Sequence, residues 1–251
     1  MAITYVGSAS NPADVGSNDT SPAAVTPHAS IVSGDLVLMF AQYRANFESL
    51  VPMSISETGG QTWSSFGGPT GNGGNPPDFT LTNIFWCQFN GTWSAAPSVI
   101  FAGVTGHCGV PVSVVMHAFH LSNAGNTWAQ EAALAVGDFY TLDDEFDPIP
   151  AVITGRTTTN ASTVTIGMWF STTWDTWHSP SGWDNLDLGG GKYVNTYGND
   201  QTSTYMKTIK TSAGATGDCQ KQGGGGEHYG VWGIVTFYET AASFIPRVSI
   251  F

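Results

Sequence analysis

Short apolar runs alternate along this chain with turns rich in glycine, proline, asparagine and serine. In the run 164–170 every second residue is apolar, the period of a strand with one face in a core, and the positions between them predict a partly wet face. The run 36–41 is apolar throughout and predicts a strand buried on both faces. The best window for an amphipathic helix, 128–136, is short. The pattern therefore predicts an all-β, antiparallel protein.

Strands are expected at residues 3–6, 32–43, 53–56, 81–89, 99–102, 112–121, 162–170, 205–211 and 229–238. A long loop follows the first strand through about Pro27, and Gly34 with Asp35 forms the turn of the next one. Residues 67–77 hold so much glycine and proline that they are expected to form only a loop.

The apolar runs of the first half recur in the same order in the second half. The matched segments are 34–40 with 162–169, the turn ending at Trp63 with the turn ending at Trp183, 81–89 with 202–211, and 112–121 with 231–238. The number of positions between matched residues falls from 128 for Leu36 and Val164 to 117 for Val114 and Val231. Shorter loops in the second copy would produce this decrease. The repeat halves span about 30–122 and 150–240.

Each repeat half holds about four strands, too few to bury a sheet face independently. The two halves are therefore expected to pack together as one antiparallel, jelly-roll-like β-sandwich in a single domain, 1–251. No acid, histidine or thiol is matched between the halves, so the repeat predicts a scaffold or a binding surface before it predicts an enzyme.

The negative net charge argues against some classes of binding partner. Seven Lys and Arg against 19 Asp and Glu give a formal net charge of −12, so nucleic acid and anionic membranes are repelled on average. No run approaches the ~20 apolar residues that a membrane helix needs. Three cysteines, Cys87, Cys108 and Cys219, argue against a disulfide framework, and free, mostly buried thiols are expected. The first residues lack the basic start of a secretion signal, so synthesis in a cytoplasm without export by a cleaved signal is expected.

The order of motifs resembles a broad group of bacteriophage structural proteins with jelly-roll or sandwich domains. The matching residues are 3–7, Pro27, 34–37, Gly182-Trp183, 205–207, 213–215 and 231–235, while Phe85-Trp86 stands where a Tyr-Lys pair belongs in the first copy. The resemblance implies a virion component, either a capsid decoration (cement) protein or a tail-fibre module. It implies the major capsid protein or other virion proteins as partners, homo-oligomers, and assembly in the host cytoplasm.

Two segments are candidates for contact with partners. The first contains Trp174 and Trp177, with Asp175 between them and His178 next to Trp177. Glycan sites and protein interfaces combine aromatic planes with polar groups in this way. Burial in the core is the alternative for both tryptophans, and Trp169 and Trp183 are expected in the core. The apolar tail 241–251 is expected to dock on its own sheet or add a strand to a neighbour. Its candidate assembly residues are Phe244, Ile245, Val248, Ile250 and Phe251.

Other constellations carry less weight. His107, Cys108, His117 and His120 contain metal-binding atoms, but His117 and His120 are three apart on a predicted strand and point to opposite faces. The acidic run 143–147 lacks the spacing of a calcium loop, so a solvated loop is favoured. The run 189–192 lacks a glycine and the Ser or Thr of a phosphate loop. No catalytic, cofactor or metal residue is therefore predicted.

Three functions compete at this point. The first is a non-enzymatic capsid decoration protein of a phage. The second is a tail-fibre or head-fibre module that binds host-surface glycans through Trp174 and Trp177. The third is a sandwich-type glycan hydrolase, whose two carboxylates would have to come from Glu57, Asp175, Asp184 or Glu227, although their spacing does not pair them.

Overall fold

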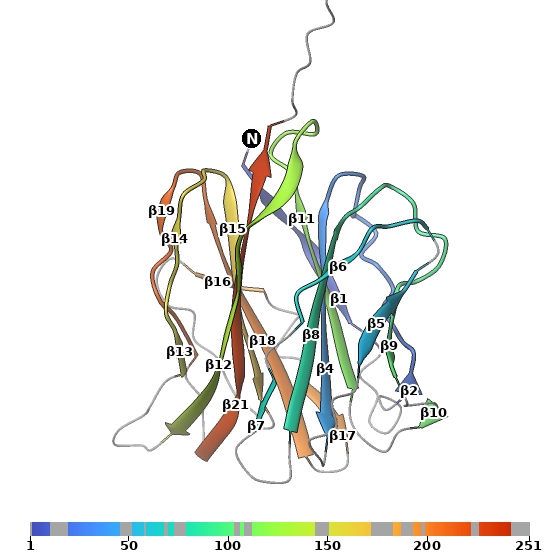
Figure 1. The fold of residues 1–251 in the computed structure, drawn as a ribbon, viewed down its shortest axis with the longest axis vertical. Coiled ribbons are helices and arrows are strands. Elements are labelled where there is room, and N and C mark those ends of the chain that lie inside the picture. The colour runs from blue at the N-terminus through green and yellow to red at the C-terminus, as the bar shows by residue number, and fades with distance from the viewer. Residues whose placement is uncertain are drawn as a thin grey trace, which may run out of the picture.

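The computed structural model describes residues 2–10, 20–45, 52–57, 59–67, 70–72, 79–102, 106–107, 112–143, 151–171, 183–186, 193–196, 199–221 and 226–241. All regular elements in these ranges are strands, and the strand pairs among them are antiparallel (Figure 1). The predicted all-β, antiparallel class is confirmed. The strands gather into large sheets in the middle of the molecule and small sheets on its outside.

The first large sheet is built from the first half of the chain. Its order is β1 (Thr4–Ser10), β11 (Val112–His120), β4 (Leu36–Ala45), β8 (Phe79–Gln88) and β6 (Ser64–Ser65), and β7 (Thr70–Asn72) also pairs with β8. The second large sheet is built from the second half. Its order is β12 (Thr127–Asp143), β21 (Gly226–Thr240), β15 (Thr163–Ser171), β18 (Asn199–Lys210) and β16 (Asp184–Asn185), and β17 (Tyr193–Thr196) also pairs with β18.

Small sheets lie on the outer side of each large sheet (Figure 1). In the first half they are β3 (Ala23–Ala24) with β9 (Ser98–Phe101) and β5 (Met53–Ser56), and β2 (Thr20–Ser21) with β10 (Gly106–His107). In the second half they are β13 (Ala151–Ile153) with β20 (Cys219–Lys221), and β14 (Thr157–Thr158) with β19 (Gly214–Ala215). Each half is thus layered by itself, and the sandwich is deeper than the pair of sheets expected from the sequence.

Three clusters of buried apolar side chains separate these layers. The inner cluster joins the two large sheets and holds Ile3, Leu36, Leu38, Phe40, Ile84, Val115, Phe119, Trp128, Val164, Ile166, Met168, Phe170, Leu186, Tyr205, Val231, Val235 and Phe237. A first outer cluster, with Val37, Met39 and Phe101, lies under the small sheets of the first half. A second outer cluster, with Trp169 and Ile153, lies under those of the second half.

The central strands of the large sheets are buried on both faces. All six side chains from Leu36 to Ala41 are fully buried, alternately in the inner and the first outer cluster, as predicted. In β15 the side that was expected to be partly wet is also buried, because β13 and β20 cover it. There the hydroxyls of Thr165 and Thr236 satisfy each other across two strands, with the oxygens 2.9 Å apart. Trp169 and Trp183 are in the core, as predicted.

The short window 128–136, in which no convincing helix was expected, belongs to β12 and pairs along β21. Two sequence expectations are corrected by the strands. The segment expected to be only a loop contains β7, since backbone pairing with β8 at a sheet edge needs few side chains. Each large sheet has six strands, against about four expected per half, because short edge strands carry little apolar signal. β7 also lies against β21 of the other half.

The two large sheets share one strand order and one register. In each, the half's first strand pairs with its last, the last pairs with the next long strand, and that strand pairs with the following one. Leu36 is opposite Gln88 and Phe119, and Val164, 128 positions later, is opposite Ile209 and Phe237. Phe119 and Phe237 occupy equivalent places in the two sheets and are 118 positions apart. The sequence match of Val114 with Val231 gave 117 positions, which is one too few. An error of one residue assigns each side chain of this strand to the wrong face of the sheet.

The same β-bulge interrupts the edge strand of each large sheet. In β1 the register shifts between Tyr5, opposite Phe119, and Gly7. In β12 it shifts between Gln130, opposite Phe237, and Ala132. The extra residues are Val6 and Glu131, 125 positions apart, as are the residues that flank them. The two sheets therefore share this irregularity, although β12 has a second register shift, between Ala132 and Ala135, that β1 does not have.

Candidate functional site

Most residues proposed as partner contacts lie outside the described residues. These are the glycan or partner candidates Trp174, Asp175, Trp177 and His178, and the tail candidates Phe244, Ile245, Val248, Ile250 and Phe251. Cys108, the side chain of His107 and the acidic residues 144–147 lie outside them as well. Their roles stay predictions, and the site is built from the polar groups that the structure places.

His117 and His120 leave β11 on opposite faces. His117 faces the inner cluster, where its ring lies near Phe40 and Tyr205 at centroid distances of 5.7 Å and 4.8 Å. His120 lies instead beside Asp35 at the end of the strand. The two imidazoles therefore do not share a site, and within the described ranges no three His, Cys, Asp or Glu side chains gather around a common point.

His117 is a neutral imidazole in the contact between the halves. Its side chain is fully buried, and a hydrogen bond of 3.0 Å joins its Nδ1 to the hydroxyl of Tyr5. Nε2 of the same ring is buried without a hydrogen-bond partner. Burial lowers the pKa of His117 from 6.5 to about 3, because the charged form would lose its hydration. The ring therefore acts as an aromatic core residue at neutral pH.

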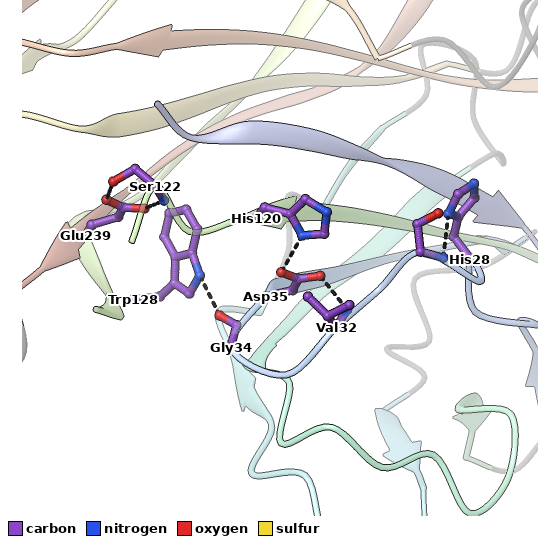
Figure 2. Close-up of polar contacts among 9 residues, drawn as sticks. His28, Val32, Gly34, Asp35, His120, Ser122, Trp128 and Glu239 are labelled. Atoms are coloured by element: carbon purple, nitrogen blue, oxygen red, sulfur yellow. Dashed lines mark hydrogen bonds and ion pairs between the residues drawn. The ribbon is translucent and has the colours of Figure 1, made fainter. Parts of the chain in front are cut away.

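The second group of polar contacts lies where the two halves are joined, between β11 and β12 (Figure 2). Asp35 is almost fully buried and accepts a hydrogen bond from the backbone N–H of Val32 at 2.8 Å. Its other carboxylate oxygen lies 2.7 Å from Nδ1 of His120, whose side chain is 35% exposed. The Gly34–Asp35 turn is thus fastened to the end of β11.

Glu239, near the end of β21, holds the connecting segment itself. Its carboxylate accepts hydrogen bonds from the backbone N–H and the hydroxyl of Ser122 (Figure 2). It also accepts one from the side-chain amide of Asn126 at 3.2 Å. The segment is also folded on itself, since the N–H of Asn126 donates to the carbonyl of Asn123 at 2.9 Å. A strand of the second half therefore fixes the connection out of the first.

Trp128 continues this contact into the first half. Its indole N–H donates to the carbonyl of Gly34 at 3.1 Å, and its backbone N–H donates to the side chain of Gln88 at 3.2 Å. We call Asp35, His120, Ser122, Asn126, Trp128 and Glu239 the junction cluster. Its members come from five different strands or turns, and its hydrogen bonds tie the two large sheets together at one end (Figure 2).

The hydrogen bonds of the junction cluster hold elements of the fold together. A carboxylate beside an imidazole is the pair that orients a catalytic base. The nearest hydroxyl in the sequence, that of Ser122, donates to Glu239 and is not directed at His120, so base and nucleophile are not paired. Each polar group of the cluster instead satisfies a backbone or side-chain group of another element, which is how buried polar networks fix a unique arrangement.

A third polar group lies at the bulge of β12. One oxygen of Glu131 accepts from the N–H groups of Thr159 and Asn160, at 2.5 and 2.8 Å, and from both side chains. Burial raises the pKa of Glu131, but these hydrogen bonds lower it by more, so the pKa lies below its ordinary value of 4.5. Arg156 donates to the carbonyl of Ala133 at 2.6 Å nearby. This group anchors the turn before β15.

The two described thiols are unreactive because they are buried. Cys87 and Cys219 are free and buried, as predicted for the cysteines. Burial raises the pKa of both thiols far above the ordinary value, so the reactive thiolate is not populated at neutral pH. Cys219 packs its sulfur 3.6 Å from that of Met206 within the second outer cluster. They serve as core residues.

A scan of the chain against protein-family models gives no match, and searches of the curated proteins and of the solved structures give none either. None of the described residues forms a helix with the length and hydrophobicity that crossing a membrane needs.

Sequence reasoning placed only part of this site. It gave the Gly34–Asp35 turn and separated His117 from His120, but it did not pair Asp35 with His120 or find Glu239. Ser122 and Asn126, the partners of Glu239, lie 117 and 113 positions away in the sequence. A contact between such distant residues cannot be predicted from the local spacing of residues. A signal was available in the matched halves: Asp35 corresponds to Thr163, and a charge at only one of two matched positions indicates a local role.

Proposed function

We propose that this chain is a non-enzymatic structural protein of a bacteriophage particle, a capsid decoration (cement) protein that stabilises the head through contacts with the major capsid protein. The motif resemblance described above points to this class. The observation that carries the proposal is the doubled scaffold, in which two sheets of one strand order and one register pack through a single apolar cluster. Such a body is stiff and presents large outer surfaces, which suits a protein that braces neighbouring subunits.

The buried and half-buried polar groups described above support the same role. Asp35, Glu131 and Glu239 bind the backbone of turns and connections, and His117 lies neutral among aromatic rings. Each of these groups is used to hold strands together. A surface that obtains its polarity chiefly from Ser, Thr and Asn, with only 10% charged residues, favours partner contacts made through hydrogen bonds and apolar area.

We also propose that the halves are the products of an internal duplication of one jelly-roll-like unit. The common strand order, the common register and the shared bulge at Val6 and Glu131 support this origin. A further match is local: the N–H of Phe66 donates to Ile84 at 3.0 Å, and the N–H of Leu186, at the corresponding position, donates to Tyr205 at 2.8 Å.

The proposal is tested on phage particles from cells that encode the chain. Quantitative mass spectrometry of purified particles is expected to find the chain in numbers comparable to the major capsid protein. Particles that lack it should release their DNA at a lower temperature, and adding the purified chain should restore the temperature. Absence from particles, or a few copies per particle as in a fibre, would contradict the decoration role. Turnover of a polysaccharide by the purified chain would contradict the non-enzymatic assignment.

A further inference from the structure

The contact between the two halves has the composition of a subunit interface. Seventeen buried residues form the inner cluster, seven from the first half and ten from the second, and nearly all are aliphatic or aromatic. Interfaces of obligate dimers resemble a domain core cut in two, with this apolar content. The aromatic contacts between the halves include Phe40 with Tyr205 at 4.7 Å and Trp86 with Phe237 at 5.1 Å.

Backbone pairing does not cross this contact in the described part of the chain. Every strand ladder there joins two strands of the same half. The halves are held together by side chains of the inner cluster, by the junction cluster and by the connection between β11 and β12. That connection runs only from Leu121 to Asn126. Two bodies that complete their own sheets and meet through side chains do not require a covalent link to recognise each other.

Part of the junction cluster holds the connection between the halves. Glu239 binds Ser122 and Asn126, so the connection is held in a form that folds the chain back on itself. These contacts depend on the closed form of the connection, whereas the hydrogen bond from Trp128 to Gly34 joins the two halves and is kept in either arrangement. The inner cluster, in contrast, offers the same apolar surface to any copy of the opposite half.

We propose that the inner faces of the two large sheets form an interface that also fits a second copy of this chain, each first half pairing with the second half of the other copy. The exchanged dimer keeps both inner clusters, all outer clusters and all sheets, and it differs from two closed chains only at the connections. Exchange of identical elements is for that reason a low-cost route to dimers. The short tether favours the closed chain, because it supplies a local concentration in the millimolar range.

Shortening the connection tests this proposal. Removing residues 122–126 leaves only Leu121 between His120 and Thr127, and two Cα-to-Cα steps reach at most about 7 Å. Sheets packed face to face lie ~10 Å apart, so the shortened chain is unable to close on itself. We expect light scattering after gel filtration to give twice the mass of the chain. A matched variant with five Gly and Ser residues in place of 122–126 loses the same contacts but keeps the reach, and should stay monomeric.

A folded monomer of the shortened variant would overturn the proposal, as would a dimer of the Gly/Ser variant that equals it in amount. If the shortened variant does not fold, a second experiment decides. A protease site is inserted between Ala124 and Gly125, which are exposed, and the folded full chain is then cut. After warming with a second, isotope-labelled cut preparation, a tag on the first half should capture labelled second halves, whereas uncut protein should capture none. Halves that separate on cutting, or that never exchange, would overturn the inference.

Discussion

At the scale of single residues, His117 makes stability depend on pH. Its pKa is about 3 in the folded chain and 6.5 in the unfolded chain, so below pH 6.5 the unfolded state binds the additional proton. Stability should therefore fall as the pH is lowered from 6.5 toward 3, by about 1.4 kcal/mol for each pH unit from this group. Urea unfolding at pH 7, 6 and 5 measures the slope.

The control for this prediction is His117→Phe, which keeps an aromatic ring in the inner cluster and removes the titration. Its free energy of unfolding should change little between pH 6.5 and pH 5, whatever its value at pH 7. An equal slope in the parent and in the variant would show that another group carries the acid sensitivity.

Two glycines give a matched pair of predictions about close packing. A Cβ at Gly155 would lie 2.1 Å from the carbonyl oxygen of Gly217, which is backbone, whereas a Cβ at Gly137 would lie 2.7 Å from the ring of Trp232. A half-buried side chain turns aside more easily than a backbone does. Gly137→Ala should therefore cost about 1–2 kcal/mol and Gly155→Ala about 3 kcal/mol or more. Thermal unfolding would separate them by a few degrees, and equal midpoints would contradict the argument.

At the scale of elements, the matched bulges show how one local geometry serves two purposes. Val6 packs into the first outer cluster, while Glu131, at the corresponding position, binds the turn at Thr159 and Asn160. The bulge frees one residue from strict alternation, so its side chain is available for either use. The two bulges therefore share a geometry and differ in what their side chains contact.

Replacing Glu131 tests the second use. Glu131→Ala removes all four hydrogen bonds and should lower the free energy of unfolding by about 1–2 kcal/mol at neutral pH, since the group is partly exposed. Glu131→Gln keeps one acceptor oxygen and should cost less. The charged form of Glu131 is the one stabilised, so its contribution is present above pH 4.5 and lost as the pH falls through its lowered pKa. The parent and Glu131→Gln should therefore converge in acid, and a gap that persists there would contradict this role.

Elements with a strong apolar signal were predicted from the sequence, and the others were not. Strand β5 was predicted with both ends correct, and the both-face burial of β4 followed from its continuous apolar run. One face of β15 was wrongly predicted to be partly exposed to water, because Thr163 and Thr165 are polar and yet lie buried. A strand shows which of its faces is more apolar, but another layer of the fold decides whether the second face is covered.

At the scale of the whole molecule, the long strands were predicted from the sequence, but their order within the sheets and the depth of the packing were not. Most long apolar runs map to one strand each, but an apolar run does not show which strands are neighbours in a sheet. Of the strands in the small sheets, β5 and β9 were predicted, and the others were missed because these strands of two or three residues lie inside segments of turn composition. The junction cluster was missed for a different reason: its partners are distant in sequence, and hydrogen bonds between distant residues leave no periodic trace.

The confinement of strand pairing to each half has a consequence for synthesis. Every strand that the structure describes in the first large sheet ends by residue 120, so these strands can pair once that residue has left the ribosome. At typical rates of elongation, its inner face then waits on the order of ten seconds for the last strand of the second half. During that interval a row of leucine, phenylalanine and isoleucine side chains faces water. The nascent chain is then most vulnerable to aggregation. Neighbouring ribosomes on the same mRNA carry further copies of the chain, and these copies are the partners most available to that face.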